Sequence, residues 1–287
     1  MIEFPDKGEK LVVGVSGGKD STAVCLYLQK LGFTPNSYKR VFCDTGWENE
    51  STYKHLEDLE KIIGKIDRIE FEAPTREDDL EFINSIENQL GFKSPMIRFI
   101  IYYGYFPSGK KRWCTSKLKL KPLEKYLNDL EFIPINVTGI RKEEGNKRAK
   151  MQEWEWADHF DCWNWRPIID WSESDVINIH KEFGVIPNRL YLKEQMSRVG
   201  CWPCIYARKK EIAQLDKNRI DIIRQLENYV TSKHDKKATF FRSDIRGSRD
   251  RSIDEVIEWS ATSRGGNQFE LFDLRPPTCR KWGLCGV

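Results

Sequence analysis

Short apolar runs alternate along the chain with stretches whose apolar residues recur at helical spacing. Residues 11–15 are apolar or small throughout, which is typical of a strand covered on both faces of a sheet. In residues 21–31 the apolar side chains fall on one helical face, and Gly32 follows where a helix would end. Three further runs predict strands at residues 40–44, 68–72 and 133–140.

This alternation indicates an α/β fold with a doubly wound, mostly parallel sheet and helices on both faces. The pattern changes near residue 195, where a cysteine-rich turn, a charged helical stretch (209–229) and a proline-containing tail follow. We therefore expect an α/β domain over residues 1–195 and a smaller, mainly helical, cysteine-rich module over residues 196–287.

Composition bears on location and on partners. No segment approaches the roughly 20 consecutive apolar residues of a transmembrane helix, and the first residues lack the apolar region of a signal peptide. We therefore expect a cytoplasmic protein without membrane contact. The formal net charge is only +3, with 47 basic and 44 acidic residues, so only local basic clusters can indicate nucleic-acid binding.

The polar segment Ser16–Ser21 joins the first predicted strand to the first predicted helix. Gly17 and Gly18 permit backbone conformations and close approaches that a Cβ would block. The free N–H groups and the positive dipole end of a helix attract an anion. Lys19 adds a positive charge, and the two serines add hydroxyl donors. The segment therefore predicts a phosphate-binding loop.

Two more polar motifs stand at the ends of predicted strands, Asp44-Thr45-Gly46 and Gly139-Ile140-Arg141. Ligands bind beyond the carboxyl ends of the strands in parallel sheets. We therefore expect these two motifs and the phosphate-binding loop to form one pocket.

The loop and four further segments together make this chain similar to the phosphoadenosine phosphosulfate reductase family of the PP-loop ATP pyrophosphatase superfamily. The four segments are residues 42–50, 112–123, 138–144 and 166–176. The resemblance implies an adenine nucleotide α-hydrolase-like fold. It also implies that the first domain is a PP-loop nucleotide-binding domain, whose relatives cleave ATP between its α- and β-phosphates.

The resemblance implies catalytic roles for Lys19, Asp20 and Arg141. Lys19 and the loop amides would hold the phosphates of ATP, and Asp20 would position Mg²⁺, which prefers carboxylate and phosphate oxygens. Asp44 would lie near the ribose or α-phosphate, and the planar guanidinium groups of Arg141 and Arg148 suit phosphate or sulfate. The implied nucleotide-binding set is Ser16, Gly17, Gly18, Lys19, Asp20, Ser21, Asp44, Gly139, Arg141 and Arg148.

Two details of these segments stay open. Gly145 stands where relatives often have a serine, which leaves the separate roles of Glu143 and Glu144 undecided. Three lysines after residue 116 either add positive charge to the pocket or form a solvated helix start; they are Lys117, Lys119 and Lys121.

Eight cysteines in a chain expected to be cytoplasmic indicate metal binding or catalysis rather than disulfides. Cys201 and Cys204 have CxxC spacing, and Cys279 and Cys285 lie in an irregular tail. Relatives place a cluster cysteine at the position of Cys114, so five candidate metal ligands compete for four places. We expect Cys25, Cys43 and Cys162 to be packed in the interior.

Two metal sites are compatible with these ligands. A [4Fe–4S] cluster would use Cys114, Cys201, Cys204 and one tail cysteine. A structural zinc ion would instead use Cys201, Cys204, Cys279 and Cys285. We favour the cluster because of Cys114 and the resemblance. Five tryptophans between residues 154 and 171 are expected to pack beneath a loop-rich region.

The leading functional hypothesis is an ATP pyrophosphatase with sulfurtransferase-like chemistry, similar to those of DNA phosphorothioation systems. It would adenylate a substrate oxygen, and sulfur from a cysteine desulfurase or from the cluster would then displace AMP. The stretch Lys233–Arg251 combines basic residues with Phe240 and Phe241, so it is either a DNA contact or a solvated loop.

Two alternatives belong to other classes. The first is a thiol-dependent reductase of phosphoadenosine or adenosine phosphosulfate. The tail keeps the Cys-Gly pair of such reductases at Cys285 but lacks the neighbouring glutamate and histidine, which weakens this hypothesis. The second is a non-catalytic nucleic-acid-binding scaffold, against which the intact Lys19, Asp20 and Ser21 argue.

Overall fold

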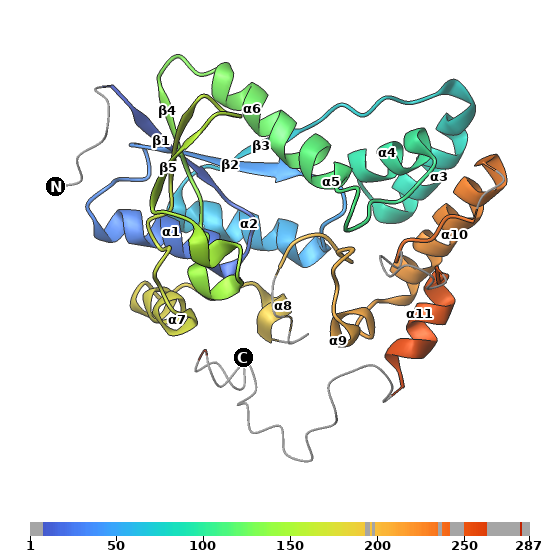
Figure 1. Ribbon diagram of the computed structural model, residues 1–287. Helices are drawn as coiled ribbons and strands as arrows, with labels where there is room; N and C mark the ends of the chain where they lie inside the picture. The colour runs from blue at the N-terminus through green and yellow to red at the C-terminus, as the bar shows by residue number, and fades with distance from the viewer. Residues whose placement is uncertain are drawn as a thin grey trace.

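The computed structural model describes residues 8–192, 196, 199–234, 237–241, 250–262 and 282. Its centre is a six-stranded sheet in the order β3-β2-β1-β4-β6-β5 (Figure 1). The neighbouring pairs from β3 to β6 are parallel, and only β5 runs antiparallel to its neighbour. The strands are β1 (Lys10–Gly14), β2 (Lys39–Asp44), β3 (Asp67–Glu70), β4 (Pro134–Val137), β5 (Trp154–Ala157) and β6 (Cys162–Trp165). The predicted α/β class and mostly parallel sheet are confirmed.

Helices cover both faces of the sheet. Leu11 and Val13 of β1 pack with one apolar cluster, whereas Val12 between them packs with another. Figure 1 shows the helices of the first cluster below the sheet and α6 above it. Those helices are α1 (Lys19–Lys30), α2 (Glu50–Ile63), α7 (Glu173–Glu182) and, on the opposite face, α6 (Lys121–Asn128). The strand is therefore apolar throughout because both of its faces are buried.

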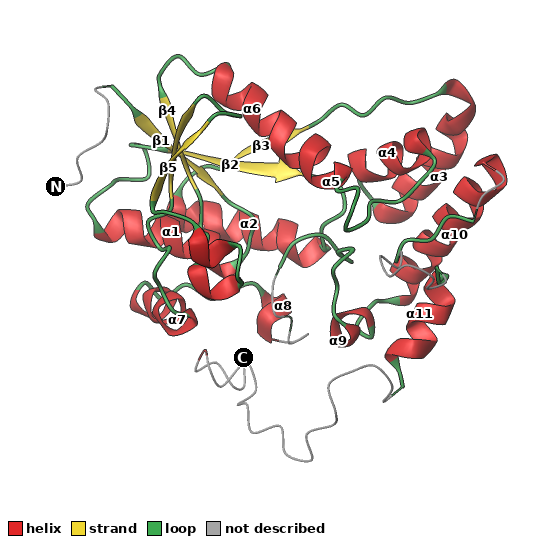
Figure 2. Ribbon diagram, viewed as in Figure 1, coloured by secondary structure: helices red, strands yellow, loops and turns green. Residues whose placement is uncertain are grey.

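A mainly helical region stands beside the sheet (Figures 1 and 2). Its longer helices are α3 (Leu80–Leu90), α4 (Pro95–Tyr103), α10 (Lys217–His234) and α11 (Ile253–Ser260). Short helical segments are α5 (Trp113–Thr115), α8 (Arg189–Leu192), α9 (Lys209–Ile212), η1 (Glu77–Asp79), η2 (Ser116–Leu120), η3 (Lys142–Glu144) and η4 (Arg148–Lys150). One apolar cluster joins α3 and α4 to α10 and α11. This cluster therefore includes residues on both sides of the expected domain boundary at 195–196. The division into two domains stays a prediction.

The tryptophan-rich segment corrects one expectation. Residues 154–157 and 162–165 are strands that extend the sheet, rather than parts of a loop-rich region. Trp154 lies opposite Trp165, with ring centroids 5.2 Å apart, and Trp156 lies opposite Trp163. Each strand has only four residues, too few for a clear alternating pattern, and the aromatic cross-strand pairs stabilise the ribbon.

Two further findings concern partners. Phe240 is fully buried and stacks on Trp47 with ring centroids 5.9 Å apart. The core therefore uses the ring of Phe240, which leaves it no exposed face for stacking on DNA. Residues 235–236 and 242–249 of the basic stretch lie outside the described residues, and a DNA contact by the stretch stays a prediction. Within the part of the chain that the structure describes, no helix is long and apolar enough to cross a membrane.

Candidate active site

The predicted phosphate-binding loop connects β1 to α1, as the sequence indicates. Its backbone folds tightly: the N–H of Ser16 donates to Oγ of Ser21 at 3.1 Å, and that hydroxyl donates to the carbonyl of Gly18 at 3.1 Å. Gly17 has a φ of +70°, and a Cβ there would lie 2.9 Å from the side chain of Thr52. Both observations explain why a glycine stands at this position.

The loop after β4 packs directly against the start of α1. A Cβ on Gly139 would lie 2.7 Å from the carbonyl carbon and oxygen of Asp20 and 2.8 Å from the nitrogen of Ser21. This close approach brings Arg141 to Asp20, where Nε donates to Oδ1 at 2.6 Å. Of the three motifs that the sequence assigned to one pocket, the loop Ser16–Ser21 and the motif Gly139-Ile140-Arg141 therefore meet.

Two buried cations and two carboxylates converge on this point. Lys19 and Arg141 are 7% and 4% exposed. Nζ of Lys19 lies 3.6 Å from Oδ2 of Asp20 and 3.8 Å from Oε1 of Glu173. Burial alone would lower the pKa of Arg141, but Asp20 and the neighbouring glutamates raise it on balance. Arg141 therefore keeps its positive charge in this buried position.

The two glutamates left open by the sequence have different partners. Glu143 accepts from Nη1 of Arg141 at 2.8 Å and from the N–H of Glu173 at 3.0 Å. Glu144 accepts from the N–H of Arg141 at 3.0 Å and pairs with Arg148. Arg148 thus reaches the site through Glu144, whereas Arg141 contacts Asp20 directly.

Asp44 is held within the loop that follows β2. Its Oδ1 accepts from the N–H of Gly46 at 2.8 Å and from the hydroxyl of Tyr53 at 2.7 Å. Tyr53 also donates to Glu48 at 3.2 Å, and the hydroxyl of Thr45 donates to Glu48 at 2.8 Å. Burial, together with the charge of Asp44, raises the pKa of the Glu48 carboxyl.

The CxxC turn is attached to this same loop. Glu48 and Cys201 form an isolated antiparallel bridge, and the N–H of Trp202 donates to the carbonyl of Trp47 at 2.7 Å. Sγ of Cys201 lies 4.0 Å from Oγ1 of Thr45. The cysteine turn therefore lies at the carboxyl end of β2, next to the strand that leads into the phosphate-binding loop.

Three of the five predicted metal ligands lie within electrostatic reach of Lys119. Burial raises the pKa of Cys201 to about 11. The positive charge of Lys119 lowers this pKa, whereas the thiols of Cys204 and Cys114 raise it further. The negative charge of the Cys201 thiolate is in turn the main reason why the pKa of Lys119 is raised, and the charge of Glu48 raises it further. Each of these groups therefore lies within electrostatic reach of the others.

The remaining metal-site expectations are not tested. Across the described ranges, no three cysteine, histidine or carboxylate side chains are arranged to hold a metal ion. Cys279 and Cys285 lie outside the described residues. Cys25 and Cys162 are buried, as expected of packed cysteines, and Cys43 is partly buried.

Tertiary structure adds residues that sequence reasoning missed. The hydroxyl of Tyr191 accepts from the N–H of Lys19 at 3.2 Å, and Nδ2 of Asn188 lies 3.5 Å from the carbonyl of Gly17. Trp282 is buried, with its ring centroid 5.2 Å from that of His180 and 6.5 Å from that of Tyr191. No local signal reveals these contacts, because the partners are distant in sequence.

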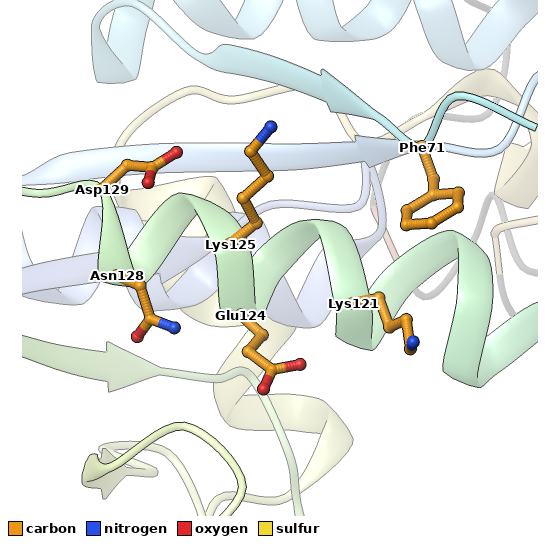
Figure 3. Close-up of a pocket in the computed structure, with 6 residues that line it drawn as sticks. All are labelled: Phe71, Lys121, Glu124, Lys125, Asn128 and Asp129. Carbon is orange, nitrogen blue, oxygen red and sulfur yellow. The ribbon is translucent and has the colours of Figure 1, made fainter.

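A surface hollow of about 340 Å³ lies elsewhere, along α6. Figure 3 shows that Lys125 and Asp129 point to one side of this helix and Lys121 and Glu124 to the other. These charged groups do not converge on one point. Of the residues considered for the predicted pocket, only Lys121 lines this hollow, and we assign no binding role to it.

Comparison with known proteins agrees with this geometry. Residues 10–207 match the family model described as phosphoadenosine phosphosulfate reductase domain. The chain belongs to this family. It is 29% identical to an uncharacterised 37.8 kDa protein of Escherichia phage 186, over 91% of this chain and 90% of that protein. The family confirms the PP-loop resemblance.

Two further relatives cover less of the chain or differ more. Adenosine 5'-phosphosulfate reductase of Burkholderia cepacia is 33% identical over 34% of this chain and 37% of its own length. The crystal structure of phosphoadenylyl-sulfate reductase from Candida auris is 15% identical, with a TM-score of 0.48 over 70% of this chain and 83% of that chain.

Proposed function

We propose that this protein is an ATP pyrophosphatase that adenylates a substrate to prepare it for sulfur insertion. The observation behind the proposal is the pair of buried cations, Lys19 and Arg141, on either side of Asp20 at the N-terminus of α1. A helix N-terminus with two fixed cations suits a polyphosphate better than a single small anion.

In the proposed reaction, a substrate oxygen attacks the α-phosphorus of ATP. The bond between that phosphorus and the oxygen bridging to the β-phosphorus breaks, and pyrophosphate leaves with the electron pair. Lys19 and the first amides of α1 would stabilise charge on the departing phosphates, and Arg141 charge at the α-phosphate. Asp20 would offer a carboxylate oxygen to Mg²⁺, although both of its oxygens now face cations.

The outer sulfur of a persulfide would then attack the activated centre, and AMP would leave with the electron pair of the bond that breaks. A second thiol would reduce the resulting disulfide, which leaves the sulfur on the acceptor and oxidises the two thiols. The nearby thiols of Cys114, Cys201 and Cys204, with one tail cysteine, would hold a [4Fe–4S] cluster. When bound, such a cluster would supply a site where sulfur or electrons are held. A cysteine desulfurase is the proposed sulfur donor, and a nucleic acid, including DNA in phosphorothioate modification, is the proposed acceptor.

The nucleotide part is tested by pyrophosphate release from ATP. Lys19→Ala should reduce the rate at least tenfold, because it removes a cation from the phosphates. Lys30→Ala, at the other end of α1 and half exposed, is the matched control and should keep the rate. Absence of ATP cleavage by the native protein with candidate acceptors would contradict the proposal.

The metal part is tested by anaerobic purification followed by elemental analysis and visible absorbance. Cys201→Ser should lose most of the metal, whereas Cys162→Ser, buried in the sheet, should keep it. Cys114→Ser separates the two metals, because Cys114 is a ligand of the cluster only. Zinc retained in Cys114→Ser would support the structural zinc site instead.

A second candidate is thiol-dependent reduction of a phosphosulfate nucleotide. The observation that favours it is the packing of Trp282 near Tyr191, because Trp282 is three positions from Cys285 in the sequence. Sulfite release from adenosine or phosphoadenosine phosphosulfate with a thiol donor, lost in Cys285→Ser, would select this function.

A further inference from the structure

An exposed basic–aromatic patch lies beside the cysteine turn. We define it as Tyr105, Lys110, Lys111, Arg112 and Tyr206. Nζ of Lys111 lies 5.2 Å from the ring centroid of Tyr105, and Cζ of Arg112 lies 5.4 Å from that of Tyr206. The hydroxyl of Tyr206 donates to the carbonyl of Gly109 at 3.5 Å. These contacts join the segment between α4 and α5 to the segment that follows Cys204.

The positive charge of this patch is not neutralised locally. Lys110, Lys111 and Arg112 are all exposed. Among the described residues, none of the three is paired with a carboxylate; the guanidinium of Arg112 donates only to the hydroxyl of Thr115, at 3.4 Å. Arg224, in contrast, pairs with both Asp221 and Asp254. The three adjacent cations therefore remain available to an anionic partner.

The patch also presents aromatic surface. Tyr206 is 45% exposed and is therefore one of the large apolar side chains that reach the surface. Tyr105 is partly exposed, and each of the two rings has a cation beside it. An acidic protein surface would satisfy the charges alone. A strand with unpaired bases supplies both repeated negative charge and flat faces that stack on aromatic rings.

The position of the patch relates it to the active site. Arg112 precedes Cys114 by two residues, and Tyr206 follows Cys204 by two. The turn from Cys201 to Cys204 is attached to the loop after β2, through the bridge between Glu48 and Cys201 and the hydrogen bond from the N–H of Trp202 to the carbonyl of Trp47. A ligand on the patch would therefore be held beside the cysteines rather than on a remote face.

We propose that the basic–aromatic patch binds an unpaired nucleic-acid strand, with phosphates on the three cations and a base on Tyr206. The inference rests on the proposed function in one respect, since it names the class of substrate that would receive sulfur. Unlike Phe240, whose ring is fully buried, Tyr206 has an exposed ring that a base can stack on. A duplex is disfavoured because its base faces are stacked on each other.

Binding is measured without ATP, by fluorescence anisotropy of a labelled oligothymidylate of about 15 nucleotides over a series of salt concentrations. The triple variant Lys110→Ala, Lys111→Ala, Arg112→Ala should reduce the slope of log K against log salt by about 2, since each phosphate contact contributes about 0.7. Tyr206→Ala should weaken binding about tenfold with the slope unchanged, because it removes stacking and no charge.

Two controls make the test specific. A triple variant with the same charge change, Lys54→Ala, Lys61→Ala, Lys65→Ala, removes exposed lysines of and just after α2 and should bind as the native protein does. An abasic oligomer of equal charge should bind the native protein about tenfold more weakly, and Tyr206→Ala should abolish that difference. Circular dichroism checks that each variant is folded.

Three results would overturn the proposal. Equal losses in both triple variants would mean that overall charge, not the patch, drives binding. Equal affinity for the abasic oligomer, with displacement by polyglutamate, would point to an acidic protein partner. Tighter binding of a duplex would exclude an unpaired strand. Because the assay contains no ATP, a failure of ATP cleavage leaves this result unchanged, and the two proposals fail separately.

Discussion

The hydroxyl of Tyr191 accepts a hydrogen bond from the backbone N–H of Lys19 at 3.2 Å, although 172 residues separate the two. This N–H belongs to the first turn of α1, where a phosphate is expected to bind. The hydroxyl of Tyr191 therefore occupies a donor that the nucleotide would use, and the ring lies 5.1 Å from Nζ of Lys19.

We expect Tyr191→Phe to bind ATP about fivefold more tightly, because the freed amide gains a phosphate partner worth about 1 kcal/mol. Equilibrium binding of ATP measures the change. Tyr38→Phe, which removes another buried hydroxyl at a distance from the loop, should leave ATP affinity unchanged. Weaker binding by Tyr191→Phe would instead mean that the hydroxyl supports the shape of the loop.

Arg141→Lys should reduce kcat/KM for pyrophosphate release by about tenfold to a hundredfold. Arg141 donates from two different nitrogens to Asp20 and Glu143, and a lysine cannot reproduce this planar geometry. Lys142→Ala changes the adjacent, half-exposed cation that pairs with Asp170, and it should retain activity. Comparable losses in the two variants would argue against a specific role for Arg141.

Gly139→Ala should destabilise the fold by about 1 to 3 kcal/mol, because the added methyl group forces the loop that follows β4 away from the start of α1. Its Cβ would lie 2.7 Å from backbone atoms of Asp20, which cannot rotate away. Gly14→Ala is the matched control, since its nearest neighbour lies 3.9 Å away. Urea unfolding compares both variants with the native protein, and equal stability of the two variants would contradict this packing argument.

Stability should decrease below pH 6.5 because of His55. Burial, with a contribution from His180, lowers the pKa of His55 to about 4. The unfolded chain therefore binds a proton that the folded chain rejects, and the stability present above pH 6.5 is lost as the pH falls toward 4. At pH 5 the loss is about 1 to 2 kcal/mol.

The effect is measured as the difference in urea midpoint between pH 7.5 and pH 5. His55→Gln should reduce this difference, because its side chain does not titrate. His159→Gln changes a side chain that is 52% exposed and should leave the difference as in the native protein. An unchanged pH dependence in His55→Gln would assign the effect to other groups.

Local patterns were sufficient for much of the fold. The apolar run at β1 and the glycines and lysine after it predict a buried strand and a phosphate-binding loop, because these features depend on neighbouring residues. The motifs at Asp44 and Arg141 could be assigned to the same edge from parallel topology alone. The strands β5 and β6 escaped prediction, since their aromatic pairs exist only across the ribbon.

The sequence by itself therefore determined the α/β class, the position of the loop and the residue types of the site. Only the tertiary structure decided that Lys119 lies within electrostatic reach of three cysteines, that Tyr191 occupies an amide of Lys19, and that Phe240 is buried against Trp47. The physical reason is that sequence patterns report local conformation and average burial. Electrostatic and hydrogen-bond partners are chosen when distant segments pack together.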